Sequence, residues 1–195
     1  MREDRGFKKY GTVFLALAVI ALWSLPLIAA PQDTANTAAD KTDSINARLT
    51  KQVRHELIML PYYSVFDVLN FSIEGTDAVV LSGQVTRPTL KSAAENVVRR
   101  IEGVSKVTNN IEVLPLSPFD DRLRLAAYRT IFSQPGFDRY ALQATSPIHI
   151  IVKNGNITLV GVVANTMDKN IAGIVANGVP GAFSVTNDLV VEHKG

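Results

Sequence analysis

The sequence contains no cysteine. Its absence excludes disulfide bonds, thiolate metal sites and a cysteine nucleophile, and it also excludes the lipid-modified cysteine of an acylated lipoprotein. Histidine is scarce: His55, His149 and His193 are the only three, and none has a second ligand-type residue at a metal-like spacing. Solvated or structural histidines are the simpler interpretation, so no metal and no cofactor are predicted.

Motifs of catalysis are missing as well. The sequence has no Gly-x-Ser-x-Gly, no glycine-rich phosphate loop and no His-Glu-x-x-His. The adjacent carboxylates Asp120 and Asp121 are better explained as the cap of a helix that begins there. An enzyme is therefore the weakest of the functional hypotheses. The net charge of +2 gives no strong field to attract nucleic acid, so no nucleic-acid partner is predicted.

An uncharged apolar run occupies residues 10–30, behind a flank that carries Arg2, Arg5, Lys8 and Lys9. This order is typical of an export signal or a membrane anchor, and the run is as long as a membrane-spanning helix. Cleavage after Ala30 would put Pro31 next to the cut, so we favour a retained anchor over a cleaved signal. Either way the positive flank is expected to stay in the cytoplasm and the rest of the chain to be exported. Residues 31–43, rich in small and polar residues, are predicted to be a flexible linker.

The remaining sequence is an internal duplication. Residues 81–85 (LSGQV) match 159–163 (LVGVV), and residues 103–113 match 181–191, both at a shift of 161 − 83 = 78. Upstream, residues 49–63 match 123–137 at a shift of 123 − 49 = 74, so the second copy has about four extra residues, which we place around 145–147. The copies are predicted to be two small domains, 44–116 and 117–193.

Each copy is predicted to fold in the order helix, strand, strand, helix, strand. Apolar residues recur at helical spacing and the strands alternate with turn signals such as Asn154-Gly155. The strand–helix–strand part is a crossover, which makes the outer strands parallel. The predicted fold class is α+β: two tandem domains, each with a three-stranded mixed sheet, preceded by an N-terminal hydrophobic helix. The first helix is expected to start after Ser44, and the second copy's last helix to bury Ile171, Ile174 and Val175.

Glycine and asparagine recur at matching positions in the two copies. Gly83 and Gly161 lie inside strands, where glycine indicates a bulge or a close backbone approach. Gly103 and Gly181 follow the second helix of each copy. Asn109 and Asn187 are expected to hydrogen-bond nearby backbone groups. We interpret all six as structural motif residues: Gly83, Gly161, Gly103, Gly181, Asn109 and Asn187.

These motifs resemble the BON family, in particular OsmY-like envelope proteins with tandem BON domains. The resemblance covers residues 44–193 and is carried by apolar-x-Gly-x-Val and by Val-x-Asn-x-apolar-x-Val in each copy. It implies a non-catalytic, membrane-associated envelope protein that binds phospholipid surfaces or envelope components, in envelope integrity or in the osmotic or envelope stress response. It also implies a location in the periplasm, tethered to the inner membrane or, if the N-terminal segment is cleaved, soluble there. The alternative it leaves open is a periplasmic protein–protein interaction module of a larger assembly.

Basic residues of the first copy are the candidate contacts for anionic phospholipid or for an envelope protein. They border its two helices, where cations favour anionic headgroups, although an ordinary solvated helix face is the simpler explanation. The candidates are Arg48, Lys51, Arg54, Arg87, Lys91, Arg99 and Arg100.

Overall fold

The computed structural model of the chain describes residues 33–143 and 145–192. The apolar run, with its predicted hydrophobic helix, lies outside the described residues. Within them, no helix combines the length and apolar character that crossing a membrane requires. The elements are α1 (Asp33–Ile58), β1 (Val68–Glu74), β2 (Ala78–Val85), α2 (Pro88–Arg99), β3 (Lys106–Asn109), β4 (Glu112–Val113), α3 (Pro118–Phe132), α4 (Asp138–Ala141), β5 (Ile148–Lys153), β6 (Asn156–Val163), α5 (Thr166–Asn177) and β7 (Ser184–Val191).

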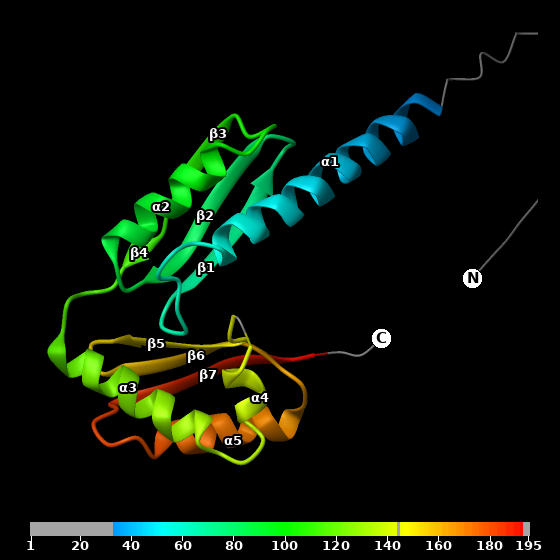
Figure 1. The fold of residues 1–195 in the computed structure, drawn as a ribbon. Helices are drawn as coiled ribbons and strands as arrows, with labels where there is room; N and C mark the ends of the chain where they lie inside the picture. Colours follow the sequence, from blue (N-terminus) through cyan, green and yellow to red (C-terminus); the bar gives the residue numbers. More distant parts are fainter. Residues whose placement is uncertain (1–32, 144, 193–195) are drawn as a thin grey trace, which may run out of the picture.

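Each half of the chain is a mixed sheet with helices on one face (Figure 1). In the first half β1 is antiparallel to β2, whereas β3 and β4 are parallel to it. In the second half β5 is antiparallel and β7 parallel to β6. The helices α2 and α5 connect the parallel strands of each sheet, as the predicted crossover requires. The predicted α+β class with two mixed sheets is therefore confirmed.

The first sheet has four strands rather than the three predicted, because the last strand is interrupted. Its two pieces keep one register on β2, with Leu81 opposite Asn109 and Gln84 opposite Glu112. Between the pieces, Ile111 donates its N–H to the side chain of Asn109 (3.2 Å). In the second half β7 runs through the equivalent position without a break.

The first helix begins at Asp33, so the predicted start after Ser44 is wrong and residues 33–43 are helical instead of a flexible linker. Alanines in this segment favour the helix, and extending an existing helix costs little once its C-terminal half is packed. Leu49, Val53 and Leu57 provide that packing and are buried. The N-terminal turns of α1 project beyond the sheet (Figure 1).

Each half buries its own apolar interior. In the first half the core is built on residues such as Leu81, Leu90 and Ile111, between α1, α2 and the sheet. In the second half it includes Leu159 and Leu189, beneath α3 and α5. Burying one such side chain contributes ~1.5–3 kcal/mol. The two copies therefore have separate cores, as expected for a duplicated domain.

A small junction joins the halves. Val68 and Leu114, from the end of the first sheet, pack with Ile151 in a third buried cluster. The loop 59–67 reaches the open edge of the second sheet, where the Val65 carbonyl accepts the N–H of Ile150 (2.8 Å). Lys153 forms an ion pair with Glu112 across the same junction, and hydrogen bonds from Gln84 and Lys153 lower the pKa of that carboxyl group.

The second copy departs from the first before β5 and along α5. The connection between α3 and β5 carries the short helix α4, which begins upstream of the 145–147 segment where extra residues were expected. On α5 the predicted burial of Ile174 is wrong, since 73% of this residue is exposed. The buried positions are instead the small residues Ala172, Gly173 and Ala176, which let the helix approach the sheet closely.

Candidate functional site

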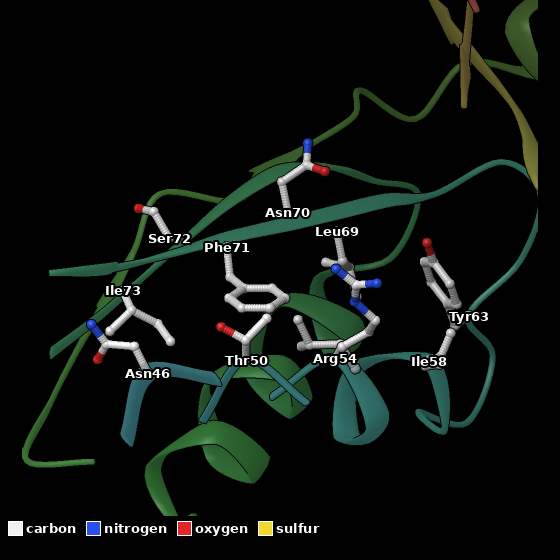
Figure 2. Close-up of a pocket in the computed structure, with 11 residues that line it drawn as sticks. Asn46, Thr50, Arg54, Ile58, Tyr63, Leu69, Asn70, Phe71, Ser72 and Ile73 are labelled. Carbon is white, nitrogen blue, oxygen red and sulfur yellow. The ribbon is translucent and has the colours of Figure 1, made fainter. Parts of the chain in front are cut away.

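The first half borders several surface hollows, and two of them are candidate sites. One is a groove of about 540 Å³ between α1 and the edge strand β1. Figure 2 shows Asn46, Thr50 and Arg54 of α1 on one side of this groove and residues 69–73 of β1 on the other. We call it the α1–β1 groove.

The second hollow lies where the two halves meet and has a volume of about 630 Å³. We call it the junction cleft. The loop before β1, the end of β2, the linker between the halves and α3 each supply part of its wall. The lining residues are Tyr62, Tyr63, Ser64, Phe66, Thr86, Arg87, Leu116, Asp121, Arg124 and Leu125.

A buried carboxylate holds the first-half wall of the junction cleft. Asp67 is 0% exposed and accepts four hydrogen bonds, from the N–H groups of Ser64 (3.1 Å) and Thr86 (2.7 Å) and from their hydroxyls (2.6 and 2.9 Å). Ser64 belongs to the loop before β1, and Thr86 follows β2. Asp67 therefore fixes together the two segments that carry Tyr62 and Arg87.

Tyr62 and Arg87 form the exposed rim of the junction cleft. The Arg87 guanidinium carbon lies 5.0 Å from the centre of the Tyr62 ring, a cation–π arrangement. Tyr62 adopts a positive φ of 69°, which is uncommon for a residue with a side chain. Leu116 is 94% exposed and Leu125 47% exposed at the same cleft. The rim thus combines one cation with several apolar side chains in water.

The second-half wall contains a buried arginine. Arg124 is 5% exposed, pairs with Asp121 and donates to the carbonyl of Val152 (2.8 Å). Its Nε is buried without a hydrogen-bond partner among the described residues. Because Asp121 offsets Arg124, the side chain of Arg87 leaves the cleft lining with a net positive charge.

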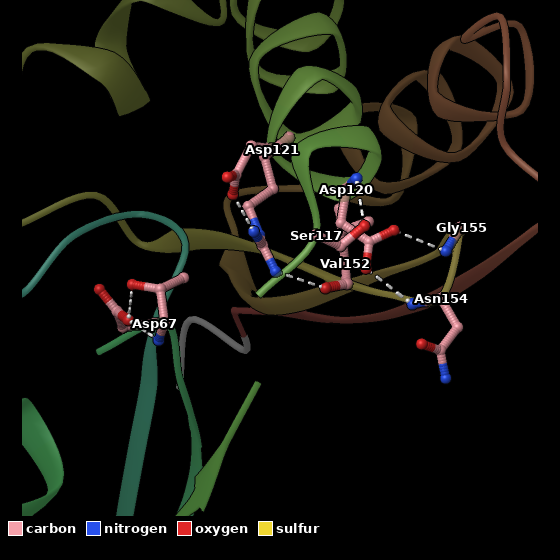
Figure 3. A network of polar contacts seen from close by, with 9 residues as sticks. Asp67, Ser117, Asp120, Asp121, Val152, Asn154 and Gly155 are labelled. Atoms are coloured by element: carbon pink, nitrogen blue, oxygen red, sulfur yellow. Dashed lines mark hydrogen bonds and ion pairs between the residues drawn. The ribbon is translucent and has the colours of Figure 1, made fainter. Parts of the chain in front are cut away.

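The neighbouring carboxylate Asp120 was expected to cap α3, and this prediction is wrong. Ser117 is the N-cap and accepts the N–H of Asp120 (3.2 Å). Asp120 is 1% exposed and accepts the N–H groups of Asn154 (2.9 Å) and Gly155 (2.8 Å), so that it closes the β5–β6 hairpin (Figure 3). Both acidic residues thus have structural partners.

The recurring asparagines make the same contact in both halves. Asn109 donates to the carbonyl of Lys91 (3.0 Å), and Asn187 donates to that of Lys169 (2.7 Å). Each bond ties the last strand to the first turns of the crossover helix. The expectation that these side chains hydrogen-bond the backbone agrees with this geometry, and the bonds leave them no role at either hollow.

The recurring glycines also have matching surroundings. Gly83 and Gly161 have φ values of +119° and +130°. Gly83 faces the carbonyl of Val68, at the start of β1, and Gly161 faces that of Pro147, just before β5. Gly103 and Gly181 have φ values of +92° and +91° after α2 and α5. All four positions serve the fold.

The seven basic candidates lie on separate surfaces. Arg87 borders the junction cleft, and Arg54 lines the α1–β1 groove. Lys51 lies in a shallow depression beside that groove. Arg100 lies between α1 and α2, near Glu56 and Glu102.

The other three candidates have partners or lie apart. Arg48 donates to the Glu102 carbonyl (3.4 Å), Arg99 pairs with Glu95, and the Lys91 side chain is half-buried. The structure thus assembles no single basic face, and contact of these residues with lipid stays a prediction.

His149 lies inside the junction between the halves. Its ring is 5.6 Å from that of Tyr63, and its Nδ1 is buried without a hydrogen-bond partner among the described residues. Burial lowers the pKa of His149 below its ordinary value of 6.5, against smaller raising effects from the backbone of Asp67 and Ser64. The folded chain therefore holds this ring neutral where the unfolded chain begins to protonate it.

We expect the junction to weaken in mild acid. Because the pKa of His149 is lower in the folded state, the unfolded state binds more protons below about pH 6.5, and the free energy of unfolding falls as the pH drops. The loss between about pH 7.5 and about pH 5.5 should be smaller in His149→Phe, which keeps an aromatic ring beside Tyr63. Urea unfolding at both pH values measures it, and equal pH dependence of the two proteins would contradict the prediction.

Among the described residues no three or more His, Cys, Asp or Glu side chains gather as a metal site would require. Among the residues that line the junction cleft, Arg87 is the one that was predicted from the sequence as a candidate lipid or partner contact. Tyr62 carries no motif, and Leu116 and Leu125 are recognisable only once the structure leaves them exposed.

Comparison with known proteins agrees with the duplicated fold. The BON domain family model matches residues 46–115 and 138–193. Among solved structures, the C-terminal domain of CdsD, a structural protein of the type III secretion system of Chlamydia trachomatis, is 14% identical, with a TM-score of 0.30 over 74% of this chain and 98% of that one. A second CdsD structure is 16% identical, with a TM-score of 0.28 over 73% of this chain and 63% of that one. No curated protein matches significantly. The chain belongs to the BON domain family and carries two matches to it in tandem.

Proposed function

We propose that the protein is an exported, non-catalytic envelope module that binds phospholipid surfaces through the rim of the junction cleft. The observation that carries this proposal is the exposure of Tyr62, Leu116 and Leu125 around Arg87. Exposed apolar side chains around a cation suit the boundary between headgroups and acyl chains, where each cation contributes about 1 kcal/mol on an anionic surface. Membrane attachment through residues 10–30 would keep the cleft close to lipid.

Vesicle flotation tests the proposal. A chain that begins at Asp33 removes the apolar run, so any lipid binding must come from the folded part. We expect it to float with vesicles of phosphatidylcholine and phosphatidylglycerol and to bind phosphatidylcholine alone more weakly. Arg87→Glu replaces an attraction by a repulsion and should weaken anionic binding by about 2 kcal/mol, roughly thirtyfold. Leu116→Ser should weaken binding to both vesicle types.

Two matched controls separate the cleft from general surface properties. Lys106→Glu makes the same charge change at the opposite end of β2, because Lys106 pairs with Ala78. Leu142→Ser removes an equally exposed leucine next to α4, outside the cleft. Both should bind like the parent chain. Failure to bind either vesicle, or equal losses in the control and cleft variants, would remove the lipid proposal.

A further inference from the structure

The first sheet has an open edge beside the α1–β1 groove. In the described residues β1 pairs with β2 on one side only, and the groove runs along its other side (Figure 2). We propose that this edge binds an extended acidic peptide segment of a partner protein, which adds to β1 as a further strand.

The register shows which backbone groups face the groove. In an antiparallel pair, alternate residues turn their N–H and C=O away from the partner strand. In the second sheet Ile150 is such a residue, since its N–H bonds Val65 outside the sheet. Ile148 pairs with Gly161 as Leu69 pairs with Gly83, so the outward set on β1 is Leu69, Phe71 and Ile73.

One of these outward groups is already in use. The Leu69 N–H donates a hydrogen bond to the Tyr63 hydroxyl. This bond lowers the pKa of Tyr63, but burial has the larger effect and raises that pKa to about 12. Phe71 and Ile73 bond no backbone group among the turn and loop hydrogen bonds of the described residues. They offer two N–H groups and two carbonyls, the pattern to which an added strand binds.

In the second half, a turn from outside the sheet binds at this edge of the fold. There the equivalent strand β5 already receives the loop 59–67, through the hydrogen bond from Ile150 to Val65. One of the two equivalent sheet edges, that of β5, is therefore already bound by another part of the same chain. On β1, the same edge borders a groove.

The side chains of the groove determine the character of the segment. Arg54 is exposed and has no carboxylate partner among the described residues, and Lys51 and His55 lie beside it on α1. The nearest acidic residue of β1 is Glu74, at its far end. Asn46 contributes a buried Oδ1 without a hydrogen-bond partner, which suits a donor of the incoming chain. An extended segment with a carboxylate opposite Arg54 satisfies these groups together.

Peptide selection on the full-length chain in detergent micelles tests the proposal. The probe is a displayed library of random seven-residue peptides. We expect the retained pool to be enriched in Asp and Glu and in β-branched residues. Arg54→Glu should weaken the best peptide by about tenfold or more, and a Lys replacing its acidic residue should restore binding to that variant. Arg122→Glu, the same change on α3, should alter affinity by no more than about twofold.

Backbone pairing is tested separately from charge. N-methylation of alternate peptide nitrogens blocks one edge of the added strand, so the methylated peptide should lose binding. The amides of Phe71 and Ile73 should become protected from hydrogen exchange when the parent peptide binds. An unenriched library, unaltered affinity after N-methylation, or unchanged exchange at both amides would overturn the proposal. Concentration-dependent dimers with these amides protected in the absence of peptide would also overturn it, because a second copy would then be the occupant.

Discussion

Replacing Gly83 or Gly161 with alanine is expected to lower the free energy of unfolding by about 4 kcal/mol in the half that carries the change. A Cβ on Gly83 would lie 2.9 Å from the carbonyl carbon of Val68 and closer still to its oxygen, and the contact of Gly161 with Pro147 is equivalent. Overpacking costs ~1–3 kcal/mol, and backbone strain at these φ values adds ~1–3 kcal/mol. Because the added Cβ meets backbone atoms, no side chain can move aside to make room. The two paired strands must therefore separate locally.

The chain offers a matched control for each glycine. Gly75 and Gly136 also have positive φ, of +68° and +84°, but nothing lies within 4 Å of an added Cβ. Their alanine variants should lose only the conformational term, ~1–2 kcal/mol. Urea unfolding followed by far-UV circular dichroism is the measurement, since the single tryptophan, Trp23, lies outside the described residues. Equal costs at Gly83 and Gly75 would show that the close backbone approach is not what requires glycine.

The duplicated glycines explain why so much of the fold could be predicted. A glycine inside an apolar segment, repeated at one spacing, marks the second strand of the predicted strand pair in each copy. Strands β2 (Ala78–Val85) and β6 (Asn156–Val163) contain the matched segments 81–85 and 159–163. The stripe of α2, with Leu90, Ala94 and Val98 buried, also follows its predicted period. In these elements the local sequence pattern and the tertiary packing favour the same secondary structure and the same buried face.

The errors occurred where packing or context decides against the local pattern. Ser44 is a good cap in isolation, yet the helix continues through it because extending a helix costs little once its C-terminal half is packed. On α5 the large residue Ile174 is exposed because Asn187 comes so close to Gly173 that only small residues fit the contact face. The spacing of apolar residues shows which face of a helix is hydrophobic. It does not show how closely that helix packs on its sheet.

The candidate surfaces were harder to predict than the fold. Both are formed by residues distant in sequence: the junction cleft brings loop 59–67 to α3, and the α1–β1 groove depends on which edge of the sheet is left open. Basic residues could be named from the sequence, but only the structure shows that Arg87 and Arg54 serve different hollows. The positioning role of Asp67 carried no signal, because a single aspartate before a strand is ordinary.

Asp67→Ala is expected to lower the free energy of unfolding by about 3–5 kcal/mol. The substitution leaves two part-buried N–H groups and two hydroxyls of Ser64 and Thr86 without their acceptor, and each unsatisfied group costs up to ~1–3 kcal/mol before relaxation. Relaxation is possible only if the loop 59–67 detaches. Because Val65 in this loop holds Ile150, the change should also loosen the junction between the halves.

Asp77→Ala is the matched control, since Asp77 is exposed and its side chain holds only the Ser105 hydroxyl. Its cost should stay below about 1 kcal/mol. Hydrogen exchange at Ile150 distinguishes the two roles of Asp67: faster exchange in Asp67→Ala under conditions where both halves remain folded shows that the loop has detached. Unchanged exchange at Ile150 would mean that Asp67 stabilises the first half alone. The hydrogen bond between Ile150 and Val65 would then hold without this carboxylate. Any loss of lipid binding in the variant would have to come from Tyr62 and Arg87 moving apart.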